Sequence, residues 1–468
     1  MNDLASAWQW ARSEFGAVKL GNALRNRRAV AVAAGYAARP AGRITAVFRD
    51  SAGREAAFRF VENGAIESEA LMASAHTAGI KRCSGEGVAY VPVDKSSLTI
   101  ADHRDEKGLG MVGTSKKNGH GLHVLTALAV TSDGTPQGIA AQQYWTRPRK
   151  AKNQQRRFRP VEETETQRWL DVMQSAADGF QAEGTNCRPW FQIDREGDAR
   201  AILRWAIEGG HWLTVRAAWD RRLRHPDDTP GLLWATIERQ PVIGSYSVEV
   251  AQAPNRQARV ANMELRACEV TLELGYPTSY SAKRRILRPI NAVLAREVGT
   301  TPRGESPLEW LLLTTRPALA FEEARAVVRG YTQRWRIEEF HKTWKSGACR
   351  IEESQLRARQ HLVRWAILAA SVAVRIVRIA YLARSKPDEA ATIEFSEHEI
   401  HAAMLLAKPV APRRKPTLKD MVGWIARLGG FVGGKSAGPP GPLVLARGLA
   451  EIETGVQMLA ALAKKPDQ

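Results

Sequence analysis

Hydrophobic and polar residues follow a helical pattern at both ends of the chain. Apolar residues recur every three or four positions through residues 4–15 and again through 24–37, and the second run stops before Pro40. Residues 385–468 contain two further amphipathic runs, LKDMVGWIARLGG and LVLARGLAEIETGVQMLAALAKK, separated by the Gly/Pro-rich GGKSAGPPGP. The pattern predicts helical regions over 1–66 and 385–468.

In the middle region, residues 67–380, segments with the apolar pattern of strands appear, with helical segments between some of them. VAYVPVD (88–94) reads as a buried strand that LTIAD can continue, LHVLTALAV and IAAQQYW as two more strands around a DGTPQG turn. A polar helix over 162–183, the strand PWFQID, the helix DARAILRWAIEGG and the strand HWLTVRA follow. Three strands in a meander and then alternating helix and strand is the order of a ribonuclease-H-like α/β sheet.

An insertion interrupts this order over about residues 217–308. Short β-patterned runs (LLWATIE, SYSVEVA, CEVTLEL) predict an inserted antiparallel sheet there, before the strand EWLLLTT and one long helix over 321–346. The expected fold class is therefore α/β, a ribonuclease-H-like core with an inserted antiparallel β-sheet, flanked by helical N- and C-terminal domains.

Charge and composition narrow the partner. The 468 residues carry a formal net charge of +19 with 44% hydrophobic residues, which predicts a folded protein that binds a polyanion. The longest apolar run, 366–374, is too short to span a membrane, and arginines around it indicate a basic amphipathic helix. No secretory signal is apparent, and the four cysteines form no CxxC pair, so we expect a reducing cytoplasm, nucleic acid as the partner and no membrane.

Candidate chemistry begins with two aspartates. Asp94 and Asp194 each end a predicted strand of the α/β sheet, where side chains can reach a cleft. The alternative is that each only caps the following turn. A basic cluster in the N-terminal region, with Arg27 and Arg28 in one turn, is either a solvated helix face or a DNA-binding surface.

A third carboxylate lies in YTQRWRIEEFHKTWKSG (331–347). On one continuous helix, Tyr331, Arg334, Glu338 and Lys345 fall within a stripe roughly 60° wide. Pairing of Arg334 with Glu338 explains part of this pattern but not the shared face of Tyr331 and Lys345. Two Asp and one Glu suit a pair of Mg²⁺ ions beside a phosphodiester backbone, and their mutual repulsion is expected to raise at least one carboxyl pKa without metal.

These motifs resemble the DDE transposases of the insertion-sequence-four family. Tyr331, Arg334, Glu338 and Lys345 match its Y-R-E-K signature, and the surrounding helix is similar to that of the transposon-five group. Further likeness lies outside this helix, in GREAAFRFVEN, DKSSL, DREGD, PLEWLLLT and LGGFVGGKSAGPPG.

The resemblance implies a cut-and-paste transposase with residue roles position by position. Asp94, Asp194 and Glu338 would be the catalytic triad that holds two Mg²⁺ ions, for which Mn²⁺ would substitute. Tyr331, Arg334, Lys342 and Lys345 would hold transposon-end phosphates. Trp310 would stack on a flipped base, although core packing explains a tryptophan there equally well.

The resemblance also implies the domain roles and the partners. Residues 1–66 would bind the DNA end, 67–380 would be catalytic with the insertion at 217–308, and 385–468 would dimerise the protein. The partners would be the terminal inverted repeats, target DNA and a second copy of the chain on DNA, in a bacterial cytoplasm at the nucleoid.

Two departures from the family pattern stand out. Lys95 replaces a hydroxyl residue in the first-aspartate motif, and the strongly basic segment 146–161 does not match closely. His120 and His123 are interpreted as packing or phosphate contacts. Two alternative functions remain open, a metal-dependent nuclease on the same fold and a non-catalytic DNA-binding regulator of transposition.

Overall fold

The computed structural model describes most of the chain. The described residues are 6–102, 106–113, 119–147, 161–252, 256–275, 286–408, 414–433 and 438–463. The basic segment named above therefore lies almost entirely outside the described residues, as does the start of the first predicted helix.

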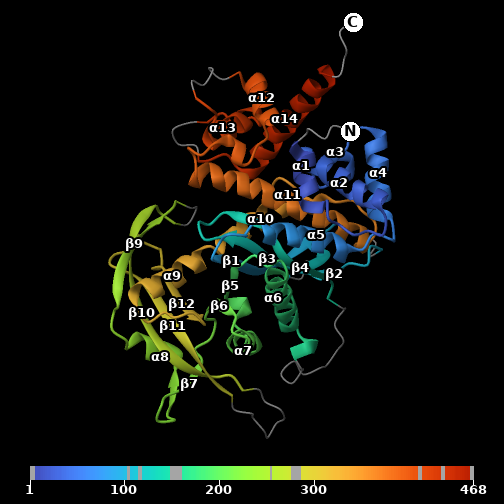
Figure 1. The fold of residues 1–468 in the computed structure, drawn as a ribbon. Helices are drawn as coiled ribbons and strands as arrows, with labels where there is room; N and C mark the ends of the chain where they lie inside the picture. The colour runs from blue at the N-terminus through green and yellow to red at the C-terminus, as the bar shows by residue number, and fades with distance from the viewer. Residues whose placement is uncertain are drawn as a thin grey trace.

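Within the described residues, twelve strands form one mixed sheet that runs through the middle of the molecule (Figure 1). Its strand order is β2-β3-β1-β5-β6-β12-β11-β10-β7-β8, with β4 on β3 and β9 on β10. β1 pairs antiparallel with β3 and parallel with β5, and β5 pairs parallel with β6. The order β4-β3-β1-β5-β6 is that of the predicted ribonuclease-H-like core. The strands are β1 (Val88–Thr99), β2 (Gly110–Val112), β3 (Gly119–Thr131), β4 (Pro136–Trp145), β5 (Arg188–Ile193), β6 (Trp212–Arg216), β7 (Arg222–Arg224), β8 (Pro230–Leu232), β9 (Gly244–Val250), β10 (Arg259–Glu273), β11 (Leu287–Val298) and β12 (Glu309–Thr314).

Helices cover both faces of this sheet, and alternate residues of β1 enter two different cores. Val91 and Val93 pack with α6 (Glu165–Ala182) and α7 (Arg200–Glu208) on one face. Tyr90 packs on the other face with α9 (Phe321–Thr332), α10 (Trp335–Lys345) and α11 (Arg359–Ser385). Because strand side chains alternate between faces, Asp94 belongs to the α10 face and Lys95 to the α6 face.

The predicted insertion does not form a sheet of its own. β10 and β11 join the central sheet through β12, which pairs with both β11 and β6. The run LLWATIE is also not a strand but the helix α8 (Leu233–Glu238). Leu233 and Ile237 are four residues apart and both fully buried, which is the spacing of one helical face and was misread as strand alternation.

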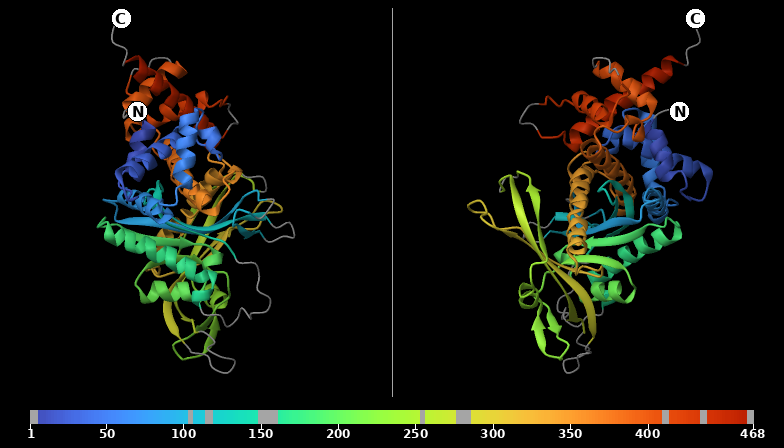
Figure 2. Two further views of the ribbon diagram at one scale, coloured as in Figure 1. Left: turned by 90° about the vertical axis from the view of Figure 1, so that its right-hand side faces the viewer. Right: turned by 60° about the vertical axis from the view of Figure 1, so that its left-hand side comes forward.

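The helical ends of the chain meet on one long central helix. The N-terminal helices are α1 (Ser6–Phe15), α2 (Ala23–Ala38), α3 (Ile44–Val47), α4 (Ser51–Glu62) and α5 (Ser68–Lys81), and the C-terminal ones are α12 (Glu397–Ala407), α13 (Leu418–Leu428) and α14 (Pro442–Leu462). Figures 1 and 2 show both groups on the same side of the sheet, with α11 running beneath them.

α11 is buried, which corrects the expectation of a basic amphipathic helix. Arg364 is 4% exposed and donates from Nη1 to the Val61 carbonyl at 2.6 Å, and Arg375 is 7% exposed and pairs with Glu399 at 3.3 Å. Within the described residues, α11 is the one helix long and apolar enough to cross a membrane, but 78% of its apolar window is buried, as in the core helix of a globular protein.

Candidate active site

Asp94 and Asp194 lie side by side on neighbouring strands. The parallel pairing of β1 with β5 ends at Val93 and Ile193, so the two aspartates follow at equivalent positions. β1 itself does not end there, because Asp94 still pairs with Thr126 of β3 and the strand continues to Thr99. Asp94 thus follows the end of the parallel pairing with β5 but lies within β1. The prediction that Asp94 ends a strand is therefore wrong.

Asp194 also has the capping role that the alternative interpretation gave it. Its Oδ1 accepts the N–H of Glu196 at 2.8 Å and caps η3 (Arg195–Gly197). Burial raises the pKa of the Asp194 carboxyl and the charge of Asp94 raises it further, while the Glu196 N–H and the Arg334 guanidinium oppose this. The expected repulsion between carboxylates is therefore present at Asp194.

Glu338 approaches the two aspartates from α10, which begins after a break in the helical segment. The predicted helix over 321–346 is two helices, α9 and α10, separated at Gln333 and Arg334. Tight turns replace helical hydrogen bonding at the break, where Arg334 N–H donates to the Tyr331 carbonyl at 3.0 Å and Ile337 N–H to the Arg334 carbonyl at 3.2 Å. Glu338 lies in the first turn of α10.

The Arg334 guanidinium lies among the acidic groups. Its Nη2 donates a hydrogen bond to Glu338 Oε1, and the side chains are 16% and 37% exposed. Burial lowers the pKa of Arg334, but the hydrogen bond that it donates to Glu338 and the charges of Glu338 and Asp94 outweigh this effect, and the pKa is raised. Arg334 is therefore a fixed positive charge beside the carboxylates.

The three carboxylates are not gathered as they would be around a bound ion. Within the described residues, no group of three His, Cys, Asp or Glu side chains stands close enough to hold a metal. Asp94 and Asp194 already act on one another, and Glu338 is held by Arg334. The oxygen donors suit a hard divalent cation, provided that Glu338 exchanges Arg334 for it.

Tyr331 and Trp310 form an aromatic pair, and Tyr331 lies near Arg334 and Asp194. Tyr331 is 6% exposed, and burial raises the pKa of its hydroxyl while the Arg334 and Arg216 charges oppose this. The Trp310 ring lies edge-on to it, with 6.3 Å between ring centroids. Trp310 is half-buried at the start of β12, so it combines the core packing and the accessibility that the two interpretations required.

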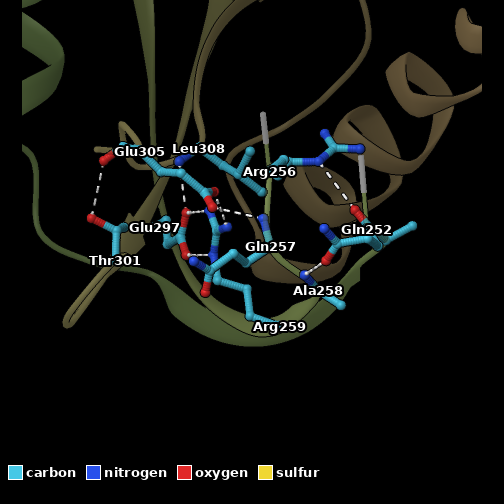
Figure 3. A network of polar contacts seen from close by, with 10 residues as sticks. Gln252, Arg256, Gln257, Ala258, Arg259, Glu297, Thr301, Glu305 and Leu308 are labelled. Carbon is cyan, nitrogen blue, oxygen red and sulfur yellow. Dashed lines mark hydrogen bonds and ion pairs between the residues drawn. The ribbon is translucent and has the colours of Figure 1, made fainter. Parts of the chain in front are cut away.

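A partly buried ionic network supports the segment that leads to Trp310 (Figure 3). Arg259 donates to both oxygens of Glu297, at 2.7 and 2.9 Å, and to Glu305 at 2.6 Å. Glu297 accepts the N–H of Leu308 at 2.8 Å, and Glu305 accepts that of Gln257 at 2.7 Å. These bonds tie the start of β10 and the end of β11 to the residues just before β12.

The remaining basic candidates lie later on α10 or in the N-terminal helices. Lys342 is exposed, and Lys345 Nζ is 3.8 Å from Glu352 Oε1 at η4 (Ile351–Glu353). Lys345 is about two helical turns beyond Glu338. Arg27 and Arg28 lie on α2, near the N-terminus and distant in sequence from the three carboxylates. They line a groove of about 650 Å³ between α2 and α4, which Arg59 of α4 also lines.

Sequence reasoning missed His341. Its Nδ1 is 3.5 Å from Asp94 Oδ2, the residue is 7% exposed, and Nε2 has no hydrogen-bond partner within the described residues. Its position three residues after Glu338, one turn along the helix, was the available signal. His123, which the sequence indicated as a packing or phosphate contact, packs: its Nε2 is 3.2 Å from the Met111 carbonyl oxygen and its ring stacks on Trp145.

Comparison with family models assigns three matches along the chain. Residues 7–66 match the transposase DNA-binding family, residues 118–375 the transposase DDE domain, and residues 371–464 the Tn5 transposase dimerisation domain.

Proposed function

The chain belongs to the DDE transposases, and from that membership we propose that it excises a transposon by cutting its DNA ends and joins them to target DNA. DNA binding and dimer formation follow from the matched N- and C-terminal domains. The observation that carries the proposal is the convergence of Asp94 and Asp194, from adjacent parallel strands, with Glu338 held beside them by Arg334.

The proposed triad is Asp94, Asp194 and Glu338, with two Mg²⁺ ions as the cofactor and Mn²⁺ as a substitute. Divalent ions are general in DDE domains, and in a two-ion site they activate the attacking oxygen and stabilise the leaving oxygen. Asp94 and Asp194 supply two ligand carboxylates whose repulsion such ions relieve. Glu338 would be the third carboxylate ligand once it leaves Arg334, and the guanidinium would then be free to bind a phosphate.

The DNA chemistry we propose is a series of in-line phosphoryl transfers. Water cleaves one strand at the transposon end and leaves a 3′-hydroxyl. That hydroxyl attacks the opposite strand and forms a hairpin, which a second water opens, and the freed 3′-hydroxyl then attacks target DNA. No covalent enzyme intermediate is needed, so the chain's own contribution is positioning and charge.

Roles for the surrounding residues follow from their positions. The transposon-end phosphates are bound by Tyr331, Arg334, Lys342 and Lys345. Trp310 stacks on a displaced base, since its ring is accessible and braced by Tyr331. Arg27 and Arg28 bind the terminal inverted repeat through the α2–α4 groove. A second copy of the chain completes the complex on DNA, at the bacterial nucleoid in the cytoplasm.

The test incubates the purified protein with Mg²⁺ and a linear duplex that carries the element's terminal inverted repeat, and resolves the products on a denaturing gel. We expect hairpinned ends and joined products that the Asp194→Ala variant does not make. Asp171→Ala, which removes an exposed carboxylate of α6, is the matched control and should retain them. Cleavage without hairpins or joining would indicate a nuclease, and binding without cleavage a regulator.

A further inference from the structure

Lys95 lies next to Asp94 but on the opposite face of β1. Val91 and Val93, which share its face, are buried against α6. The side chain of Lys95 is 22% exposed, so it is largely enclosed by its neighbours. Lys95 is one of the two departures from the family pattern, and the proposed function gives it no role.

Two carboxylates hold the Lys95 ammonium. Its Nζ is 2.9 Å from Glu196 Oε2 and 3.5 Å from Glu165 Oε2. Glu196 is also the residue whose backbone N–H donates to Asp194 Oδ1 at 2.8 Å. A continuous path of bonds therefore runs from the residue after Asp94, through Glu196, to the carboxylate of Asp194.

The second partner connects Lys95 to the other departure. Glu165 accepts a hydrogen bond from Arg147 Nη2 at 2.8 Å. Burial alone would raise the pKa of Glu165, but the Arg147 hydrogen bond and the charges of Lys95 and Arg147 lower it to about 2. Arg147 and Glu165 bracket residues 148–160, which contain six Lys and Arg and no acidic residue. Lys95 thus lies where the two atypical parts of this chain meet.

We propose that Lys95 is a positioning residue that holds the Asp194 turn against β1 and so sets the separation of the two aspartates. The inference rests on the proposed function, in which these aspartates share metal ions. Two neighbouring carboxylates repel one another, which favours a wider separation in the metal-free protein. The Lys95–Glu196 pair opposes it from the other face of the strand, and groups that orient metal ligands in this way raise metal affinity.

The competing explanation is that the Lys95–Glu196 pair is a surface ion pair with no effect on the positions of the two aspartates. Glu196 is 56% exposed, and pairs with so exposed a partner commonly contribute little to folding stability. The two explanations differ in what they predict for metal binding, since such a surface pair leaves the affinity of the aspartates for a divalent ion unchanged.

The experiment measures Mn²⁺ binding by electron paramagnetic resonance on the full chain bound to a duplex with a pre-cleaved transposon end. Lys95→Met should raise the Mn²⁺ dissociation constant about tenfold, within the range known for groups that orient metal ligands. Lys95→Arg should restore most of the affinity. Glu196→Gln should weaken binding similarly, and the double variant should be no weaker than either single one because both break the same link.

Lys386→Met is the matched control, since it removes a Lys–carboxylate pair with 2.7 Å between Lys386 Nζ and Asp133 Oδ2, in another part of the molecule. Thermal midpoint and DNA-end affinity are measured for every variant, and Lys95→Met should leave both near the wild-type values. Wild-type Mn²⁺ affinity in Lys95→Met, or an equal loss in Lys386→Met, would overturn the inference. If Asp194→Ala bound Mn²⁺ as tightly as the wild type, the proposed metal site itself would fail.

Discussion

Among single residues, Arg334 determines the electrostatic state of the site. Its guanidinium donates a hydrogen bond to Glu338, and the charges of Glu338 and Asp94 raise the pKa of Arg334. The positive charge of Arg334 in turn opposes the rise in the pKa of Asp194. The acidic groups are thus partly compensated without a divalent ion. In the proposed function, a divalent ion would replace Arg334 as the partner of Glu338, and the released guanidinium would then be available to a DNA phosphate.

The raised pKa of Asp194 has a testable cause. Asp94→Asn removes the negative charge that raises it, so the Asp194 pKa should fall toward the ordinary aspartate range in metal-free protein. Carbon-13 NMR titration of the Asp194 carboxyl measures this, with Asp171→Asn as the control. An unchanged Asp194 pKa in Asp94→Asn would mean that the charge of Asp94 does not contribute to the shift.

The same pKa predicts how metal stabilisation depends on pH. Because the folded-state pKa is raised, protonation of Asp194 stabilises the metal-free fold at low pH, and that contribution is lost as pH rises through the folded pKa. Metal binds the ionised form, so the stabilisation by Mg²⁺ should grow as pH rises through the same pKa. Urea midpoints with and without Mg²⁺, across pH, measure the difference. The pH dependence should disappear in Asp194→Asn.

The Lys345–Glu352 pair makes a prediction about DNA affinity. If Lys345 binds an end phosphate, Lys345→Met should lower the slope of log affinity against log salt by about one. Glu352→Gln should strengthen binding, because Glu352 competes with DNA for Lys345. Titration of a fluorescent duplex at several salt concentrations measures both. An unchanged slope in Lys345→Met would remove that lysine from the interface.

At the scale of elements, the break between α9 and α10 brings the signature residues to the aspartates. α9 lies close on the sheet at Gly330, where an added Cβ would be 2.9 Å from the Tyr90 ring and 3.2 Å from Gln192. The break follows three residues later, at Gln333–Arg334. Close packing of α9 therefore sets the height at which Tyr331 and Arg334 lie above β1 and β5.

Gly330→Ala should destabilise the protein by about 1–3 kcal/mol because the added methyl overpacks the contact with Tyr90. Gly423→Ala is the matched control, since that glycine lies within α13 and an added Cβ meets nothing within 4 Å. There the substitution should stabilise the helix by up to about 1 kcal/mol. Urea unfolding of both variants tests the pair, and equal effects would show that packing on Tyr90 is not the cause.

At the scale of the molecule, α11 joins the N-terminal helices, the sheet and the C-terminal helices. Arg364 reaches the α4 carbonyl of Val61, and Arg378 donates to Gln137 of β4 at 2.6 Å. Arg375 pairs with Glu399 of α12, and its charge also acts on Glu14 of α1. The DNA-binding, catalytic and dimerisation regions are thus linked by contacts of three arginines of α11, of which Arg364 and Arg375 are buried.

Arg375→Met should cost about 3–5 kcal/mol in stability, because it leaves the buried carboxylate of Glu399 without its cation. Replacing both residues, Arg375→Met with Glu399→Leu, should recover much of the loss. Arg59→Met, which breaks an exposed pair with Glu55, is the control and should change stability by less than about 1 kcal/mol. Urea unfolding measures the free energy of unfolding of each variant. A small loss in Arg375→Met would mean that water reaches the Glu399 carboxylate.

Local patterns were sufficient for much of the fold. The spacing of apolar residues predicted β1, β3, β4, β5, β6 and β12 in an order that the sheet confirms. It failed at α8, where two buried residues at helical spacing lie in a short apolar run, and at the break after Gln333, since no glycine or proline marks it.

The sequence alone determined which residues could carry the chemistry, since residue type and strand or helix period are local properties. Asp94, Asp194 and Glu338 became candidates in this way, with their roles implied by the family resemblance, and the charge indicated a polyanion partner. Only the tertiary structure decided what each side chain contacts. The Asp94–His341 and Arg364–Val61 contacts join residues hundreds of positions apart, and Lys95 meets Glu196 across two strands. Such pairs depend on how faces pack, which no local period encodes.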